Sequence, residues 1–251
     1  MRWVEPERHA RSELRDSIST HLRLARLTHE LVESAVGTAM PGRLAPPPHA
    51  AEVQARLLVK LSPDLRVIEW SARNSYVLQA LGIAATVYEL AHAVAYIGTS
   101  DDRARRWETH TDTARSYPSS RERRRAVRAT IEHSLPGHSD MESMIDRQEQ
   151  LYEVFCMAKH GNPKVLRYFG VAVRGDRVQL YHGPFVAPYV IRQARFVLLK
   201  ASSLVAGAAA IFARPLLEGA PPRVRMRFDR LDSTVSDLML RLNAEAERRA
   251  T

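Results

Sequence analysis

Apolar residues recur every three or four positions along most of this chain, and that spacing predicts amphipathic α-helices. In residues 1–40 one helical face carries Leu14, Ile18, Leu22, Ala25, Val32 and Val36. The segment 41–48 contains four prolines, which lack a backbone N–H and cannot continue a helix. We therefore expect an N-terminal helix over residues 1–40 and a proline-rich linker over residues 41–48.

Residues 49–215 are expected to form the core bundle. Within it, Ser62 and Pro63 predict the start of a helix, because serine caps helix N-termini and proline suits the first helical position. That helix is expected to run to Ile97. Residues 80–97 are apolar on nearly every side, and such a helix lies in the centre of a fold.

Three more helices are expected in the C-terminal half. Two of them cover residues 139–160 and 184–213, and Pro215 is expected to end the second. The third, over residues 221–249, carries apolar residues at alternating spacings of four and three: Val224, Phe228, Leu231, Val235, Leu238 and Leu242. Such a heptad seam predicts packing against another helix, either of this chain or of a partner.

One segment, residues 170–182, alternates apolar and polar residues as β-strands do, and Gly175 and Asp176 favour a two-residue turn in its middle. Two strands are not stable alone, so we expect this hairpin to lie against the helices or against a second copy. The expected fold is therefore a single, mainly all-α domain over residues 1–251. We expect an antiparallel helical bundle with one small β-hairpin insertion.

The composition is that of an ordinary globular protein, 45% hydrophobic and 26% charged. The formal net charge of +9 rests on 33 arginines and only four lysines, and it favours an acidic partner. The 28 acidic side chains also allow extensive ion pairing, and an arginine-rich composition is typical of bacterial genomes rich in G and C. Nucleic acid is therefore the less favoured partner, and a solvated, ion-paired surface is the simpler interpretation.

The predicted location is the cytoplasm. The N-terminal residues lack the apolar stretch of a secretory signal, and the longest uncharged apolar runs, 74–88 and 201–213, are shorter than the ~20 residues that span a membrane. Cys156 is the only cysteine, which excludes intrachain disulfides and cysteine-rich zinc sites. No cofactor and no membrane contact are expected.

Several polar residues lie on helices that are expected to be buried. Glu89 and His92, three positions apart, share one helical face, and Arg73 and Asn74 lie earlier on the same predicted helix. Further candidates follow near the other two central helices: Glu153, Lys159, His160, Asn162 and Arg192. Because a buried charge needs a partner, these residues predict either a polar pocket between the three helices or a network of structural ion pairs.

The Glu-x-x-His spacing of Glu89 and His92 also occurs in helical bundles that hold two metal ions. Those bundles need a second copy of the motif on a facing helix. Cys156 stands where Glu153 would need a histidine, so the second copy is missing. We predict no metal site.

Arg128 precedes His133 by five positions. This spacing loosely resembles the motif of HEPN-type helical proteins. The resemblance implies metal-independent RNA cleavage in a dimeric helical bundle, in which Arg128 would hold the scissile phosphate and His133 would move the proton of the ribose 2′-hydroxyl. The chain departs from that family at Ala129, where the family has a polar residue.

The stretch Phe-Cys-Met-Ala-Lys-His-Gly-Asn-Pro over residues 155–163 ends one of the predicted helices. Together with the pair of Glu89 and His92 and the predicted hairpin, it is similar to a family of helical bacterial proteins of unknown function, over about residues 67–212. This resemblance implies a shared helical fold and no particular activity.

Three functions stay open on the sequence alone. The leading hypothesis is a non-catalytic interaction or regulatory module that binds a partner protein or an acidic ligand and forms a homodimer through the C-terminal seam or the hairpin edge. The second is a HEPN-like ribonuclease that uses Arg128 and His133. The third is a small-molecule or metal-binding enzyme built around the polar residues of the central helices. Whether the protein is an enzyme is left open.

Overall fold

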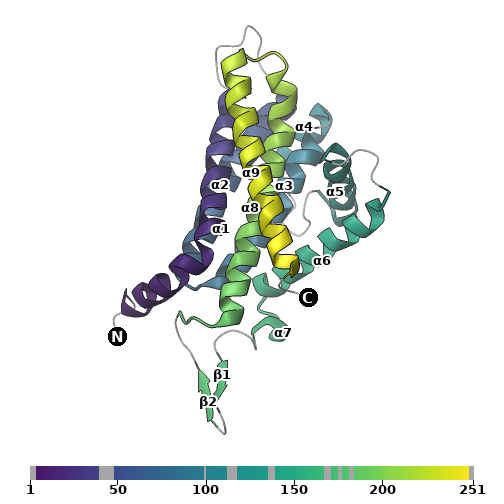
Figure 1. The fold of residues 1–251 in the computed structure, drawn as a ribbon. Coiled ribbons are helices and arrows are strands. Elements are labelled where there is room, and N and C mark those ends of the chain that lie inside the picture. Colours follow the sequence, from purple (N-terminus) through teal and green to yellow (C-terminus); the bar gives the residue numbers. More distant parts are fainter. Residues whose placement is uncertain are drawn as a thin grey trace.

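The computed structural model describes residues 4–39, 48–98, 100–111, 118–134, 139–166, 171–174, 177–180 and 184–248. In this part of the chain five long helices form a bundle: α1 (Val4–Ala39), α2 (His49–Arg73), α3 (Val77–Ile97), α8 (Pro188–Leu217) and α9 (Pro222–Arg248) (Figure 1). Shorter helices lie beside it: α4 (Asp101–Glu108), α5 (Ser120–Ser134), α6 (Met141–Lys159) and α7 (Pro163–Leu166). The prediction of an all-α helical fold is confirmed.

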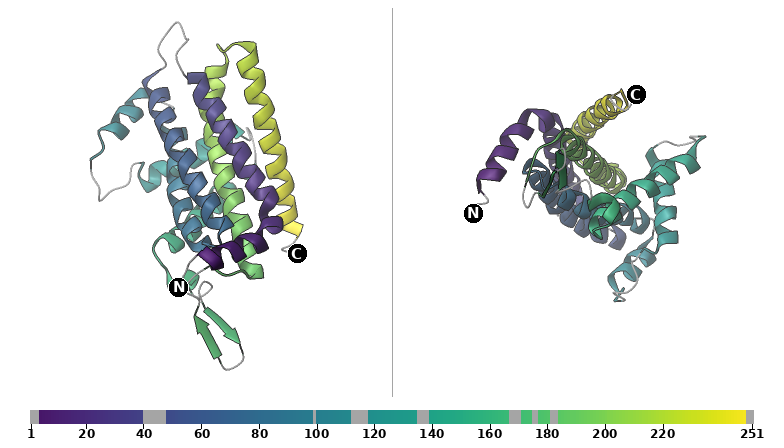
Figure 2. Two further views of the ribbon diagram at one scale, coloured as in Figure 1. Left: turned by 90° about the vertical axis from the view of Figure 1, so that its left-hand side faces the viewer. Right: turned by 90° about the horizontal axis from the view of Figure 1, so that it is seen from below.

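The long helices are not antiparallel throughout. Direction reverses from α1 to α2 to α3 and from α8 to α9, but α8 runs parallel to α1 and α3 (Figures 1 and 2). The reason is the chain between Ile97 and Pro188, which leaves the bundle at one end, forms α4–α7 and returns to the other end. As a result α8 contacts α1, α2, α3 and α9, and it occupies the central position together with α3.

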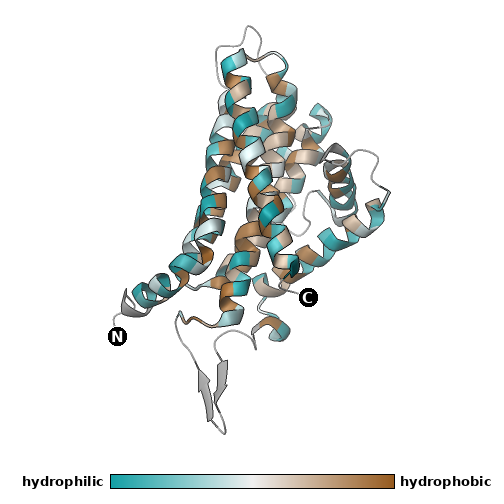
Figure 3. Ribbon diagram, in the orientation of Figure 1, coloured by the Kyte–Doolittle hydropathy of each residue, from teal (hydrophilic) through white to brown (hydrophobic). Residues whose placement is uncertain are grey.

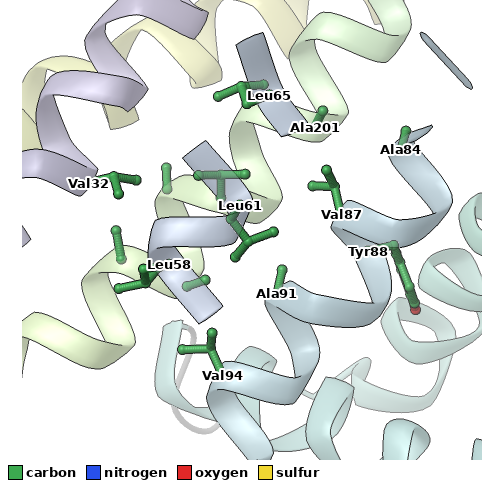
Figure 4. Close-up of a cluster of buried hydrophobic side chains, with 14 of the residues drawn as sticks. Val32, Leu58, Leu61, Leu65, Ala84, Val87, Tyr88, Ala91, Val94 and Ala201 are labelled. Carbon is green, nitrogen blue, oxygen red and sulfur yellow. The ribbon is translucent and has the colours of Figure 1, made fainter. Parts of the chain in front are cut away.

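Apolar side chains from α1, α2, α3 and α8 meet inside the bundle and form the core. Figure 4 shows part of this cluster, in which Val32 of α1, Leu61 of α2 and Val87 of α3 point into the space between the helices. Seven of the sixteen buried residues of α8 are alanines, whose small side chains allow neighbouring helices to approach closely. This apolar interior supplies most of the free energy of folding.

The heptad seam of α9 is used within this chain. Phe228, Val235, Leu238 and Leu242 are buried, and α9 contacts α1 and α8. Hydrophilic and hydrophobic residues alternate around α9 in Figure 3, as expected of a helix with one buried face. The seam is therefore not available as the surface of a homodimer.

Two predicted helix boundaries were wrong. Pro63 lies within α2 and Pro215 lies within α8. Both prolines are exposed, so water can replace the backbone hydrogen bond that each proline removes. The helix break comes later, between Asn74 and Tyr76, where Ser75 adopts a φ of 66°. Of the predicted linker, residues 41–47 lie outside the described residues.

Two short strands, β1 (Val171–Arg174) and β2 (Arg177–Leu180), pair antiparallel with each other. Within the described residues they contact no helix, so the expected packing against the bundle is absent there. Residues 175 and 176 lie outside the described residues. The helices define the fold class.

Two helices of the described chain, α3 and α8, are long and apolar enough to cross a membrane. They are longer than the uncharged runs in the sequence because α3 includes Glu89 and α8 includes Arg192, Arg195 and Lys200. Their most apolar windows are 72% and 67% buried within the fold, and core helices of soluble proteins pass the same test. This is weak evidence, so the absence of membrane contact stays a prediction.

Candidate functional site

The structure gives Glu89 and His92 different neighbours although both lie on α3. Glu89 Oε1 accepts a hydrogen bond of 2.5 Å from the Tyr152 hydroxyl, and Lys159 Nζ lies 3.8 Å from the same oxygen. His92 is buried against the ring of Tyr88 at a centroid distance of 4.4 Å, and neither of its ring nitrogens has a hydrogen-bond partner among the described residues. The two side chains therefore do not form an acid–base pair.

The environment of His92 keeps its ring neutral. Burial removes water from the imidazole and, together with the nearby Arg123 guanidinium, lowers its pKa from the usual 6.5 to about 3. A histidine with such a pKa carries no proton to donate at pH 7. It is therefore a neutral residue of the core at pH 7 and not a general acid.

Aromatic stacking ties the Glu89 side chain to α5 and α6. The Tyr152 ring stacks on Tyr88 at 4.9 Å, and the Arg123 guanidinium lies 4.2 Å above the Tyr152 ring. Burial raises the pKa of both tyrosines above the usual 10, so both stay neutral and Tyr152 remains a hydrogen-bond donor to Glu89. This network fixes the positions of three helices, which is a structural role.

The other expected residues on α6 and after it do not join that network. Glu153 and His160 are exposed. Asn162 Oδ1 accepts a hydrogen bond of 2.9 Å from the Lys164 backbone N–H at the start of α7. Arg192 lies on α8 and lines a separate cavity between α8 and α9. The sequence-predicted set is thus spread over several surfaces. Glu89 lies beside Lys159, whereas Glu153, Asn162 and Arg192 lie elsewhere.

Arg128 belongs to a ladder of ion pairs between α5 and α6. It pairs with Glu142, and Arg124 pairs with Glu142, Asp146 and Glu149. These side chains are largely exposed, so the ladder contributes little to stability. His133 lies in α5, but its side chain is outside the described residues. Of the proposed ribonuclease pair, the structure therefore describes only Arg128, whose guanidinium is occupied by a carboxylate.

Arg73 and Asn74 lie at the end of α2, beside a groove between α1 and α2. Asn74 is buried, and its Oδ1 accepts hydrogen bonds of 3.1 Å and 2.7 Å from the Arg11 guanidinium. Arg73 pairs with Glu69 at 2.5 Å. These contacts join the start of α1 to the end of α2 and close one end of a groove between the two helices.

This α1–α2 groove has a volume of about 840 Å³. The two helices run side by side in Figure 2. Six arginines and three glutamates line it, with one histidine, one tryptophan, one leucine and one serine: Arg11, Arg15, Ser19, Leu22, Arg23, Arg26, His29, Glu30, Glu33, Arg66, Glu69, Trp70 and Arg73. Trp70 is 52% exposed and stacks on Tyr76 at 5.8 Å. A large exposed aromatic ring in a charged groove is typical of a binding surface.

The positive charge of the groove is only partly neutralised. Glu69 pairs with Arg73, and Glu33 lies 3.9 Å from Arg66. Within the part of the chain that the structure describes, no carboxylate lies within 4 Å of Arg15, Arg23 or Arg26. Arg15 and Arg26 are eleven residues apart, which places them on the same helix face about 16 Å from each other. The groove therefore presents a row of unpaired cations.

His29 lies beneath this row and adds no charge at neutral pH. Its Nδ1 lies 3.1 Å from the Ser62 hydroxyl. Burial lowers its pKa to about 4, and the nearby Arg66 guanidinium acts in the same direction while Glu33 opposes it. The charge of the groove at pH 7 is therefore set by its arginines and glutamates alone.

Neither the α1–α2 groove nor the cavity at Arg192 is lined by Glu89 or His92. Among the described residues no group of three or more histidine, cysteine or acidic side chains could hold a metal ion. Comparisons with protein-family models, with curated proteins and with solved structures found no match. The functional argument therefore rests on the geometry of the chain itself.

Proposed function

We propose that this chain is a non-catalytic binding module whose α1–α2 groove takes an acidic segment of a partner protein. The observation that carries the proposal is the row of Arg15, Arg23 and Arg26, which line the groove with no carboxylate within 4 Å among the described residues. Arginine is the residue best suited to bidentate recognition of carboxylates. The carboxylates of an acidic partner would form ion pairs with these three guanidinium groups.

A protein segment suits the groove better than a polyphosphate chain. Three glutamates line the same groove and would repel a uniform row of phosphates. Leu22 and the exposed Trp70 add apolar area, which favours a ligand that carries apolar side chains beside its acids. An acidic amphipathic helix lying between α1 and α2 has both features.

The two enzymatic alternatives receive less support. Arg128 is engaged by Glu142, and Glu89 and His92 do not contact each other. No cofactor is needed for the proposed binding. A cytoplasmic location and a homodimer remain predictions, and neither is required by the groove.

The test measures binding of a fluorescein-labelled peptide of about 16 residues, with glutamate and leucine at helical spacing, which as a helix would cover ~24 Å of the groove. Fluorescence anisotropy with the full chain gives the dissociation constant. Replacing Arg15, Arg23 and Arg26 together with glutamine is expected to weaken binding at least about tenfold. Binding by the unchanged protein should also weaken as salt concentration rises.

The matched control replaces Arg223, Arg227 and Arg230 of α9 with glutamine, which removes the same charge from exposed positions outside the groove. This variant is expected to bind the peptide like the unchanged protein. An equal loss in both variants would mean that net charge alone drives binding and would overturn the proposal. Tighter binding of a single-stranded oligothymidine of equal length would assign the groove to nucleic acid instead.

A further inference from the structure

A second cavity lies where the C-terminal half of α9 meets α8, α6 and α1, away from the α1–α2 groove. Its volume is about 560 Å³, within the range of roughly 300–1,000 Å³ that small-molecule sites occupy. The lining residues come from four helices: His21, Val154, Arg192, Gln193, Arg195, Phe196, Leu199, Lys200, Leu242, Asn243, Glu245 and Ala246. Three of these helices, α1, α8 and α9, pack against one another and hold most of the wall in place.

The larger part of the wall is apolar. Phe196 and Leu199 of α8 face Leu242 and Ala246 of α9, and Val154 of α6 closes one side. Phe196 is held in place by Phe155, whose ring centroid lies 6.2 Å away. Burying an alkyl chain against such a wall is favourable by roughly 0.8 kcal/mol for each CH₂ removed from water.

Cations dominate the polar part of the wall. Arg192, Arg195 and Lys200 of α8 line the cavity, and Glu245 is the carboxylate that lines it. No carboxylate lies within 4 Å of the three cations in the described residues. Arg195 Nε donates a hydrogen bond of 2.7 Å to the Ser17 carbonyl, which fixes its guanidinium beside the cavity.

Lys200 is half-buried, whereas Arg192 is exposed. Its Nζ donates a hydrogen bond of 3.0 Å to Asn243 Oδ1, a neutral partner. Burial lowers the pKa of Lys200, and the opposing effect of Glu247 does not restore it. An anion placed beside Nζ would relieve this desolvation by pairing with the ammonium group.

We infer that this cavity binds a single-chain amphiphile with an anionic head, such as a medium-chain fatty acid. The carboxylate lies between Arg192 and Lys200, and the alkyl chain extends along Phe196, Leu199 and Leu242. An uncharged chain would leave the cations unpaired, and a small anion would leave the apolar wall exposed to water. Only a ligand with both parts satisfies both regions of the wall.

The test is a calorimetric titration of the full chain with decanoate below its micelle concentration. Decanoate is expected to bind with one site per chain, whereas decanol and decyltrimethylammonium bind at least about tenfold more weakly. Equal binding of all three probes would show that the cations play no part and would overturn the inference. So would the absence of decanoate binding.

Four variants locate the site. Lys200→Met and Arg192→Gln are each expected to weaken decanoate binding about tenfold, since each removes one charged partner of the head group. Ala246→Phe fills the cavity without changing the charge and is expected to abolish binding. Arg241→Gln removes a charge from an exposed position of α9 outside the cavity and is expected to bind like the unchanged protein. Circular dichroism of each variant checks that the fold is retained.

Both a free fatty acid and a membrane lipid have an anionic head and an alkyl chain. Sedimentation of the protein with phosphatidylglycerol vesicles distinguishes between these two possible ligands. The protein is expected to stay in the supernatant. Co-sedimentation that Ala246→Phe abolishes would assign the cavity to a bilayer lipid and overturn the inference of a free acid. Neither outcome bears on peptide binding in the α1–α2 groove.

Discussion

Replacing Phe155 with alanine is expected to lower the free energy of unfolding by about 3–5 kcal/mol. Phe155 is completely buried, and it is one of few buried side chains on α6, together with Ile145 and Ala158. α6 packs mainly against α3. Removal of the ring leaves a cavity that the rigid helices around it cannot fill, so the loss includes both transfer and cavity terms.

Urea unfolding followed by circular dichroism measures this effect. Leu240→Ala on α9 is the control, because Leu240 is 69% exposed and its truncation is expected to change stability by less than about 0.5 kcal/mol. A loss below about 1 kcal/mol for Phe155→Ala would mean that α6 is not anchored through this ring, since surface positions give changes of that size.

The helices were predictable from the sequence because burial of one apolar face is a local property of the chain. The spacing of Leu14, Ile18 and Leu22 predicts α1 without knowledge of its neighbours. Pro63 was a misleading signal. It lies on the exposed side of α2, where water can bind the backbone carbonyl that proline leaves without a hydrogen-bond donor. At the break after α2, Asn74 accepts hydrogen bonds from Arg11, 63 residues away, and a contact between positions so far apart is not visible in a local pattern.

The candidate site was harder to predict because it needs two helices in register. Glu89 and His92 stand out on an apolar helix, yet Tyr152, Tyr88 and Lys159 decide what they do, and these neighbours come from tertiary packing. The α1–α2 groove had a partial signal in the sequence. Arg15 and Arg26 share one face of the first helix, but the pairing of α1 with α2 that turns this face into a groove wall cannot be inferred from spacing.

The arginines of this protein lie in two different electrostatic environments. On α5 and α6, Arg124 and Arg128 meet carboxylates and form a solvated ladder, as the simpler interpretation of the composition predicts. On α1, Arg15 and Arg26 have no carboxylate within 4 Å among the described residues. Net charge does not distinguish these two surfaces, whereas the position of each side chain relative to the acids does.

The protein is expected to lose about 2 kcal/mol of stability between pH 7 and pH 5 through His92 alone. The folded pKa of about 3 lies below the unfolded value of about 6.5. Between these values the unfolded chain binds a proton that the folded chain excludes, so acid favours unfolding and the stability is regained as pH rises through 6.5. His29, with a pKa lowered to about 4, acts in the same direction.

His92→Leu tests this expectation, because the variant places an apolar side chain of similar size at this buried position and removes the titration. The ring nitrogens of His92 have no hydrogen-bond partner among the described residues, so the variant is expected to fold with stability near that of the unchanged protein at pH 7. Its loss of unfolding free energy between pH 7 and pH 5 should be smaller by about 2 kcal/mol. His160→Leu at an exposed position is the control and should keep the full loss. An unchanged pH dependence in His92→Leu would mean that the buried ring accepts its proton without unfolding, which the apolar surroundings on α3 do not allow.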